Sequence, residues 1–376
     1  MTPEEAAPDL SSLVTVDDFE AAARARLPAM AYDYFRSGAD EEHTLRRNRE
    51  AWSEYALWYR TLVDVAKPEL GATVLGAPVS TPLLVAPTAY HRMAHPEGEL
   101  ASARAAAAEG SLYVASTLAT TSVEELSQSA PAGHRWFQLY VHADRAFTEK
   151  LVERARKAGC TALVLTADTP VLGRRLADVR NGFALPQGLE MANLVENMDA
   201  SIREGDGSLL ARYVAARHDP TLTWKDLGWL AERAFPMPVV VKGIVRGDDA
   251  RRALDHGAAA VWVSNHGGRQ LDQAPSTAEA LEEVTAAVGQ RAEVYVDGGV
   301  RSGTHCLVAL GLGARAVFLG RPVLWGLACG GEAGVRRVLS LLREELLRAM
   351  KLAGCANLAA AREGLVRRRG TGLTAR

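Results

Sequence analysis

Eight short apolar segments recur along the chain, and helix-like stretches separate them. Apolar residues fill nearly every position of these segments instead of alternating with polar ones, which predicts parallel strands covered on both faces. The segments are residues 83–87, 112–116, 136–140, 162–167, 239–242, 260–264, 294–297 and 316–319.

The stretches between the segments carry ordinary helix start and stop signals. An alanine-rich helix is expected after residues 96–99 and ends near Gly110, and Asp144 opens a helix that stops at Gly159. Eight such alternations predict a (β/α)8 TIM barrel over about residues 80–330. Helical regions are expected at about 15–60 and from about 331, and we expect residues 1–376 to form a single domain.

One connection, between the fourth and fifth predicted strands, is far longer than the others. It covers about residues 176–223 and contains Gly182, Gly188, Gly205 and Gly207 among mixed charges. Long loops inside compact domains are usually functional, so we expect a lid over the barrel mouth. A membrane-inserting segment would need a stronger apolar or basic amphipathic face.

Composition narrows the class of protein. Hydrophobic residues make up 48% of the 376 positions, enough for a large core, and the net charge of -2 gives no sign of nucleic-acid or anionic-membrane binding. Cys160, Cys306, Cys329 and Cys355 are scattered without metal-ligand spacing, so we expect free thiols and no metal site. No secretory signal or spanning segment is visible, and a cytoplasmic protein is expected.

The segment 264–272, Ser-Asn-His-Gly-Gly-Arg-Gln-Leu-Asp, follows the sixth predicted strand. An imidazole at His266 can take a proton, and a guanidinium at Arg269 can hold a carboxylate through two hydrogen bonds. In a TIM barrel the chemistry lies at this end of the strands. Taken alone, a segment of this kind is more often an ordinary polar loop.

Other predicted strands also end in polar groups. The last two loops contain Asp297, Gly298, Gly299 and Arg301, and Gly320 with Arg321. Glycine-rich loops after strands seven and eight often bind phosphate, which suggests a phosphorylated cofactor across the barrel mouth. Lys242 ends an apolar strand and is expected under the polar edge of the cofactor ring; the alternative is a structural salt bridge.

These residues resemble the FMN-dependent 2-hydroxy acid oxidases and dehydrogenases over about residues 15–360. The 264–272 segment is the most specific of the matching motifs. The others are the motifs at 27–34, 93–99, 137–140, 165–170 and 173–175. The resemblance implies an FMN cofactor and the oxidation of an S-2-hydroxy acid to the 2-oxo acid.

The resemblance also implies roles for individual residues. His266 would be the active-site base and Asp168 would orient it. Arg269 and Arg175 would hold the substrate carboxylate, with Tyr34 and Tyr140 as hydrogen-bonding partners. Lys242 would stabilise negative charge on the flavin. The remaining cofactor contacts would come from Pro87, Thr88, Ala89, Ser116, Gln138, Thr166, Ser264, Asp297, Gly298, Gly299, Arg301, Gly320 and Arg321.

One position departs from glycolate oxidase, which has a tryptophan where this chain has Leu118. The smaller side chain should open space around the substrate's R group, and Tyr90 could form an aromatic wall there. A substrate larger than glycolate is therefore expected: lactate, a longer aliphatic acid or a mandelate. The alternative is that Leu118 merely packs and the lid sets specificity.

Several alternatives remain open from the sequence. O2 is the expected electron acceptor, with H2O2 as product, but a quinone or cytochrome would make the enzyme a dehydrogenase. The resemblance also implies a homo-oligomer, commonly a tetramer. Rival interpretations are an FMN barrel of the type 2 isopentenyl diphosphate isomerase kind and a non-catalytic flavin-binding barrel.

Overall fold

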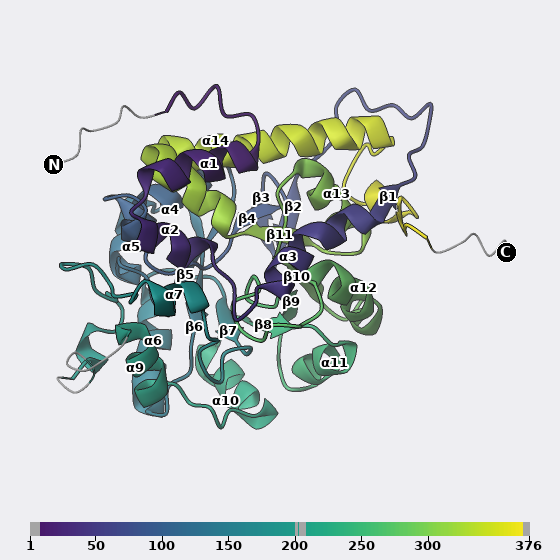
Figure 1. Cartoon of the computed structure of the whole chain (residues 1–376). Coiled ribbons are helices and arrows are strands. Elements are labelled where there is room, and N and C mark those ends of the chain that lie inside the picture. Colours follow the sequence, from purple (N-terminus) through teal and green to yellow (C-terminus); the bar gives the residue numbers. More distant parts are fainter. Residues whose placement is uncertain (1–7, 200–201, 203–207, 371–376) are drawn as a thin grey trace.

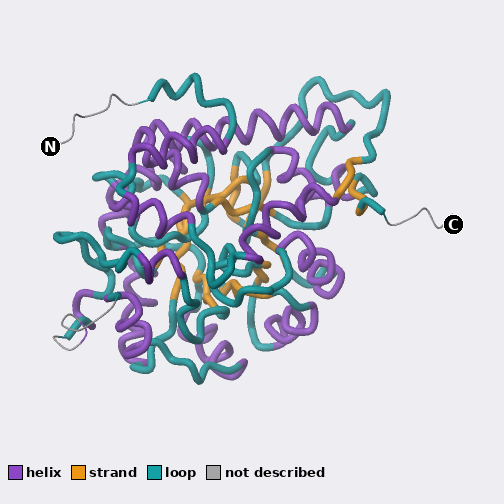
Figure 2. Tube along the Cα trace, in the orientation of Figure 1, coloured by secondary structure: helices purple, strands orange, loops and turns teal. Residues whose placement is uncertain are grey.

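The computed structural model describes residues 8–199, 202 and 208–370, and its centre is a closed barrel of eight parallel strands (Figure 1, Figure 2). All eight predicted strands form, with ends that differ from the predicted ones by at most two residues. They are β4 (Leu83–Val85), β5 (Leu112–Ser116), β6 (His134–Leu139), β7 (Leu163–Thr166), β8 (Val239–Ile244), β9 (Ala260–Val263), β10 (Glu293–Val296) and β11 (Ala316–Leu319). Pairing of β11 with β4 closes the ring, which confirms the predicted barrel.

Helices surround the strands on the outside of the barrel (Figure 2). The predicted start signals act as expected: Asp144 Oδ1 accepts hydrogen bonds from the backbone N–H groups of Ala146 and Phe147 at 3.0 and 3.2 Å. The surrounding helices are α4 (Gly98–Ala108), α5 (Val123–Ser129), α6 (Arg145–Lys157), α10 (Trp224–Ala234), α11 (Gly247–Asp255), α12 (Thr277–Val288), α13 (Gly303–Gly311) and α14 (Arg321–Ala353).

Helix α14 differs from the prediction, which placed a C-terminal helical region from about residue 331. It starts ten residues earlier, directly after β11, and contains a kink at Gly330 and Gly331. Gly331 has φ +57°, a backbone conformation that ends a regular helix and favours glycine. The last barrel helix and the C-terminal helix are therefore joined across this kink, and α14 runs alongside α1 in Figure 1.

Large aromatic side chains fill the barrel interior. Trp136, Trp262, Tyr295 and Phe318 come from four different strands and are at most 1% exposed. The rings of Trp262 and Phe318 stack with centroids 3.7 Å apart. Residues of the hairpin β2 (Ala72–Val74) and β3 (Ala77–Val79) belong to the same buried cluster. The barrel is thus a packed core rather than a pore.

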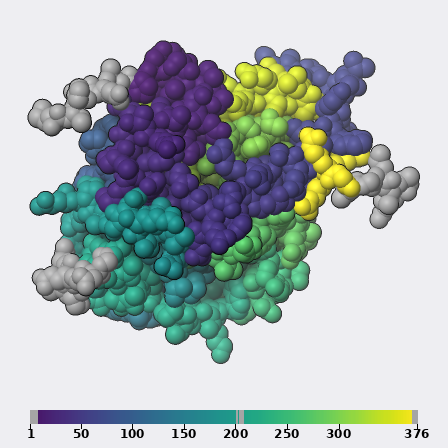
Figure 3. All heavy atoms as spheres, in the orientation of Figure 1, coloured from purple at the N-terminus to yellow at the C-terminus, as the bar shows by residue number. Residues whose placement is uncertain are grey.

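The predicted N-terminal helical region is present and crosses one face of the molecule, as the purple and dark blue atoms of Figure 3 show. Its short strand β1 pairs antiparallel with the C-terminal strand β12. The N-terminal elements are α1 (Val16–Arg26), α2 (Ala29–Arg36), α3 (His43–Glu50), η1 (Ala51–Glu54) and β1 (Tyr55–Leu57). Three further short elements lie elsewhere in the chain: η2 (His91–Met93), η4 (Ala360–Arg362) and β12 (Val366–Arg368).

The long connection between β7 and β8 contains helical turns, so the predicted lid loop is not irregular throughout. Its described elements are α7 (Leu176–Arg180), η3 (Val195–Asn197) and α9 (Leu209–Arg217). Residues 200–201 and 203–207 of the predicted lid, which include Gly205 and Gly207, lie outside the described residues, as do 1–7 and 371–376. Within the described part of the chain, no helix is long and apolar enough to cross a membrane.

Candidate active site

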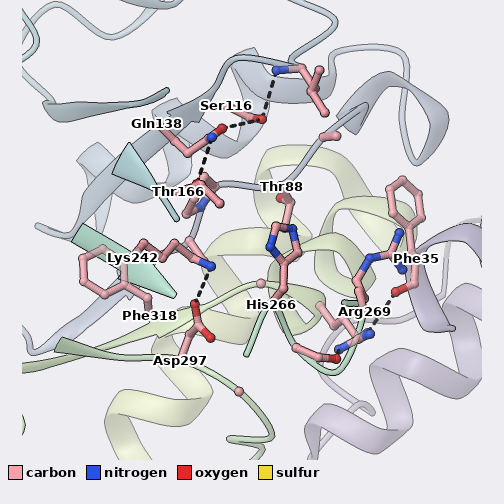
Figure 4. A pocket seen from close by; sticks show the side chains of 18 of the residues that line it. Phe35, Thr88, Ser116, Gln138, Thr166, Lys242, His266, Arg269, Asp297 and Phe318 are labelled. Atoms are coloured by element: carbon pink, nitrogen blue, oxygen red, sulfur yellow. Dashed lines mark hydrogen bonds and ion pairs between the residues drawn. The ribbon is translucent and has the colours of Figure 1, made fainter. Parts of the chain in front are cut away.

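A cavity opens at the C-terminal ends of the barrel strands, where the predicted site residues gather (Figure 4). All of the predicted residues except Asp168, Ser264 and Tyr90 line it. The predicted residues in its wall are Tyr34, Pro87, Thr88, Ala89, Ser116, Leu118, Gln138, Tyr140, Thr166, Arg175, Lys242, His266, Arg269, Asp297, Gly298, Gly299, Arg301, Gly320 and Arg321.

His266 and Asp168 form a hydrogen-bonded pair across two strand ends. His266 Nδ1 lies 2.9 Å from Asp168 Oδ1, and Asp168 lies behind the imidazole as predicted. A carboxylate at this distance selects the tautomer with the proton on Nδ1, because that nitrogen then donates the bond. Nε2 is left as the basic nitrogen of a side chain that lines the cavity.

The backbone around His266 is held in an unusual conformation. His266 has φ +57°, in the left-handed region that residues other than glycine rarely adopt. A Cβ on the nearby Gly268 would lie only 2.6 Å from the backbone nitrogen of Leu45 in α3. The loop after β9 therefore passes close to α3 of the N-terminal region, and Gly268 makes this close contact of the two backbones possible.

The electrostatics of the pair suit a proton acceptor. Burial lowers the pKa of His266, and the attraction of Asp168 offsets this only in part. Burial by itself raises the pKa of Asp168, but the charge and hydrogen bond of His266, followed by Lys242, outweigh it and hold that pKa below its ordinary value. At neutral pH the pair therefore consists of a neutral imidazole and an ionised carboxylate.

Lys242, near the C-terminal end of β8, takes part in polar contacts that join the ends of three neighbouring strands, and Figure 4 shows its contact with Asp297. Its Nζ donates to Ser264 Oγ at 2.8 Å, and that hydroxyl donates to Asp297 Oδ1 at 2.8 Å. Lys242 Nζ also lies 3.4 Å from Asp297 Oδ2. The structural salt bridge is therefore real, yet Lys242 and Asp297 also line the cavity, while Ser264 supports them from behind.

Three polar side chains form a second row across β5, β6 and β7. Gln138 Nε2 donates to Thr166 Oγ1 at 3.0 Å, and Ser116 Oγ donates to Gln138 Oε1 at 3.3 Å. All three are buried and line the cavity. This row of fixed donors and acceptors suits the polar edge of a flat ring.

Two arginines approach the cavity next to His266. Arg269 donates from Nη1 to the backbone oxygens of Tyr34 and Ser37 at 2.6 and 2.9 Å, and its guanidinium lies 4.9 Å from the centre of the Tyr34 ring. Burial, followed by repulsion from Arg175, lowers the pKa of Arg269 to about 10. Two neighbouring cations in a buried wall attract an anion, as expected for a carboxylate clamp.

Arg301 and Arg321 form a second cationic group beside Gly298, Gly299 and Gly320. Burial, then repulsion from Arg49, lowers the pKa of Arg301 to about 10, and burial followed by repulsion from Arg269 and Arg301 lowers that of Arg321 strongly. Arg301 Nε is buried without a partner among the described residues. Arg321 reaches the backbone oxygens of Phe35, Gly267 and Ser37 at 2.9 to 3.1 Å.

The structure corrects the expected position of Tyr90. Its side chain is 1% exposed and does not belong to the cavity wall. The ring instead packs 5.5 Å from Tyr34 and 6.4 Å from Phe183, whose own ring stacks on Tyr34 at 4.3 Å. Tyr90 therefore supports Tyr34 from behind, because the left-handed backbone at Tyr90 (φ +62°) turns the chain there.

Several cavity residues were not predicted from the sequence. Thr169 and Leu172 follow β7 directly, and the strand-end rule could have identified them. Leu210, Val214 and His218 belong to α9 or follow it, inside an insertion to which that rule does not apply. The other unpredicted residues in the wall are Phe35, Ala86, Gly267, Val300, Phe318, Leu319, Pro322 and Leu324.

The residues of the cavity fit an FMN molecule. Arg301 and Arg321 form no salt bridge with a carboxylate among the described residues, and their positive charges beside glycine backbone match a phosphate group. The row Ser116–Gln138–Thr166 matches the polar edge of a flavin ring, and Lys242 supplies a buried positive charge on the same cavity. Phe318 adds an apolar surface to the cavity from the barrel core.

Comparison with known proteins agrees with this assignment. Residues 23–368 match the model of the FMN-dependent dehydrogenase family. The chain is 50% identical to glycolate oxidase 1 of Oryza sativa subsp. indica (93% of this chain and 94% of that protein) and 51% identical to L-lactate oxidase of a Nostoc species (93% and 96%). It also resembles the crystal structure of mandelate oxidase with (S)-4-hydroxymandelic acid, with a TM-score of 0.90 and 44% identity over 94% of this chain and 99% of that one.

The chain belongs to the FMN-dependent dehydrogenase family. It is an oxidoreductase with FMN as its cofactor, as predicted for an enzyme that acts on a CH–OH donor.

Proposed function

We propose that the protein oxidises an S-2-hydroxy acid to the corresponding 2-oxo acid and transfers the two electrons to O2, giving H2O2. The observation that carries this proposal is the His266–Asp168 pair on the same cavity as the two arginines Arg175 and Arg269. A base and a carboxylate clamp are what a 2-hydroxy acid requires. The names of the relatives, which include glycolate, lactate and 2-hydroxyacid oxidases, support the same class.

Arg175 and Arg269 hold the substrate carboxylate, and Tyr34 and Tyr140, which line the same cavity, hydrogen-bond the carboxylate and the hydroxyl. The fixed carboxylate directs the C2 hydroxyl toward His266 Nε2. His266 accepts the hydroxyl proton there, and Asp168 stabilises the resulting imidazolium. In the alternative carbanion route His266 accepts the C2 proton instead. The same residues serve both routes.

When bound, FMN would supply the acceptor for the two electrons that leave C2, together with the C2 hydrogen as a hydride where His266 has taken the hydroxyl proton. Arg301, Arg321 and the glycines of the last two loops would hold its phosphate, and Ser116, Gln138 and Thr166 would bind its ring, with Pro87, Thr88 and Ala89 beside it. Lys242, fixed by Ser264 and Asp297, places a buried positive charge where negative charge develops.

The substrate is larger than glycolate in this proposal. Leu118 lies in the cavity wall together with Leu210 and Val214, so the wall there is apolar. Such a wall favours lactate or an acid with a longer aliphatic or aromatic R group over glycolate, which has no R group on C2. Leu210 and Val214 belong to α9 in the long connection between β7 and β8. They support the alternative that the lid contributes to specificity.

We further propose that the whole chain acts as a single domain, works in the cytoplasm and assembles into a homotetramer. The tetramer rests on the resemblance to the family, the single domain on the eight strand–helix alternations, and the location on the scattered cysteines and the absence of a visible secretory signal.

The test is a substrate screen with an oxygen electrode. The FMN-loaded protein is given glycolate, (S)-lactate, (S)-2-hydroxyoctanoate and (S)-mandelate, and both O2 consumption and H2O2 formation are recorded. The proposal predicts equal amounts of 2-oxo acid and H2O2, with glycolate a poor substrate. Substrate oxidation that needs an added quinone or cytochrome would identify a dehydrogenase, and a clear preference for glycolate would contradict the expected substrate size.

A further inference from the structure

The lid side of the cavity wall contains one polar side chain that the proposed mechanism does not use. His218 follows α9 and lines the cavity next to Leu210 and Val214 of the same helix. It is 6% exposed. Its ring stacks on Tyr140 with centroids 4.7 Å apart and an angle of 25° between the planes. His218 therefore lies one ring away from a residue of the predicted catalytic group.

The ring nitrogens of His218 have no protein partner. Both Nδ1 and Nε2 are buried and make no hydrogen bond to any described residue. A neutral imidazole has one N–H donor and one acceptor nitrogen, and burying either without a partner costs free energy. Burial, reinforced by the nearby His142, lowers the pKa of His218 to about 3, so the ring is neutral at physiological pH.

The neighbouring His142 shows what a structural histidine looks like in the same cluster. Its ring lies 5.5 Å from that of His218, it is fully buried, and it does not line the cavity. Its Nε2 lies 2.8 Å from the hydroxyl of Tyr213, which fixes the ring, while its Nδ1 is buried without a partner among the described residues. His218 makes no such contact with any described residue, and its side chain lines the cavity, so a ligand bound there is a candidate partner for one of its nitrogens.

We propose that His218 is a specificity-determining residue that hydrogen-bonds a polar group on the side chain of the substrate. The substrate class is then a 2-hydroxy acid whose R group is largely apolar but carries a hydroxyl or a similar hydrogen-bonding group. Leu118, Leu210 and Val214 contact the apolar part, and His218 offers either a donor or an acceptor to the polar one. This inference rests on the proposed function, since it assumes that the cavity binds a 2-hydroxy acid.

The experiment compares matched substrates that differ by one hydroxyl group. One set is (S)-mandelate with its 3-hydroxy and 4-hydroxy derivatives, and the other is (S)-2-hydroxybutyrate with (S)-2,4-dihydroxybutyrate. In the wild-type holoenzyme, kcat/KM for the best hydroxylated acid of at least one set should exceed that of its parent by about tenfold, the effect of one ordinary hydrogen bond.

Three variants separate hydrogen bonding from packing. His218→Phe keeps a ring that can stack on Tyr140 but removes both nitrogens, and it should bring the tenfold preference to about one. His218→Gln keeps a donor and an acceptor and should retain a preference. His142→Phe makes the same chemical change one ring farther from the cavity; it should lower Tm but leave the preference unchanged.

A binding measurement gives a readout apart from turnover. Calorimetry with benzoylformate and its hydroxylated derivatives, the 2-oxo acid products, should show the same preference in Kd and the same loss in His218→Phe. A preference that survives in His218→Phe, or its absence from both substrate sets, overturns the role of His218. That result is distinct from failure of the proposed function, in which none of the 2-hydroxy acids is oxidised.

Discussion

The two sides of the cavity are built in different ways. On the barrel side, His266, Asp168, Lys242 and Asp297 stand at strand ends, and each has a short polar contact to another of these residues or to Ser264. On the lid side, Leu210, Val214 and His218 come from an insertion, and none of their side chains has a hydrogen bond within the described residues. In the proposed function, the barrel side therefore carries the chemistry and the lid side contributes to the choice of substrate.

The strongest test of the barrel side is His266→Gln. The variant should retain FMN, because the phosphate and ring contacts come from other residues, but turnover should fall by about 10²–10⁴-fold with loss of the general base. Stopped-flow kinetics and FMN content check both points. Full activity would end the assignment of His266 as the base.

Lys242→Met should slow the bleaching of the flavin by about 10²-fold, the usual cost of removing one group that stabilises developing charge. The Asp297 carboxylate also loses its ion-pair partner, so Tm should fall. Anaerobic stopped-flow absorbance measures the rate. An unchanged rate together with a lower Tm would mean that Lys242 is only structural.

Arg269→Lys should lower kcat/KM by about 10–100-fold, because a lysine cannot reproduce the planar two-point contact of a guanidinium with a carboxylate. It would also lose the contacts to the backbone oxygens of Tyr34 and Ser37. Steady-state kinetics with lactate or mandelate check this. If Arg269 only holds α2 in place, Arg269→Lys should lose as much activity toward a substrate amide, which lacks the carboxylate charge, as toward the acid.

Leu118→Trp acts in the loop after β5, where we expect the R group of the substrate, and should change selectivity instead of chemistry. The indole fills part of the space for the R group, so kcat/KM for mandelate should fall at least about tenfold relative to that for glycolate. Competition between the two acids measures the ratio directly. An unchanged ratio would assign specificity to the lid residues alone, and equal losses for both acids would indicate a folding defect.

The smallest effect concerns pH. Since burial lowers the pKa of His266, kcat/KM should stay constant through neutrality and fall only below the ordinary histidine value near 6.5, where the base becomes protonated. Asp168→Asn removes the carboxylate that supports the imidazolium, so the acid limb should move to lower pH while the maximal rate falls. An acid limb above pH 7 would contradict the neutral His266.

Much of the barrel side could be predicted from the sequence. Continuous apolar runs identified the eight strands, and the rule that barrel chemistry lies at strand ends brought His266, Lys242 and Arg321 to one cavity. The strand-end rule did not show that Ser264 lies behind the wall, and the place of Asp168 beside His266 was implied only by the resemblance to the family. That depends on side-chain direction at each strand end, which hydrophobic periodicity does not reveal.

The places of Tyr90 and of His218 on the lid were beyond such rules. Tyr90 follows a strand and was expected in the wall, but its left-handed backbone and its packing on Tyr34 place it behind. His218 lies in an insertion without strand register, and its contact with Tyr140 joins segments far apart in the sequence. Only tertiary structure brings such residues to the cavity.

The most direct test of the central claim is an anaerobic absorption titration of the purified holoenzyme with (S)-lactate and (S)-mandelate. The account predicts flavin absorption bands that bleach with at least one acid and return when O2 is admitted, with one H2O2 formed per FMN. Flavin bands that stay unchanged with every 2-hydroxy acid, in protein that binds FMN, would contradict it.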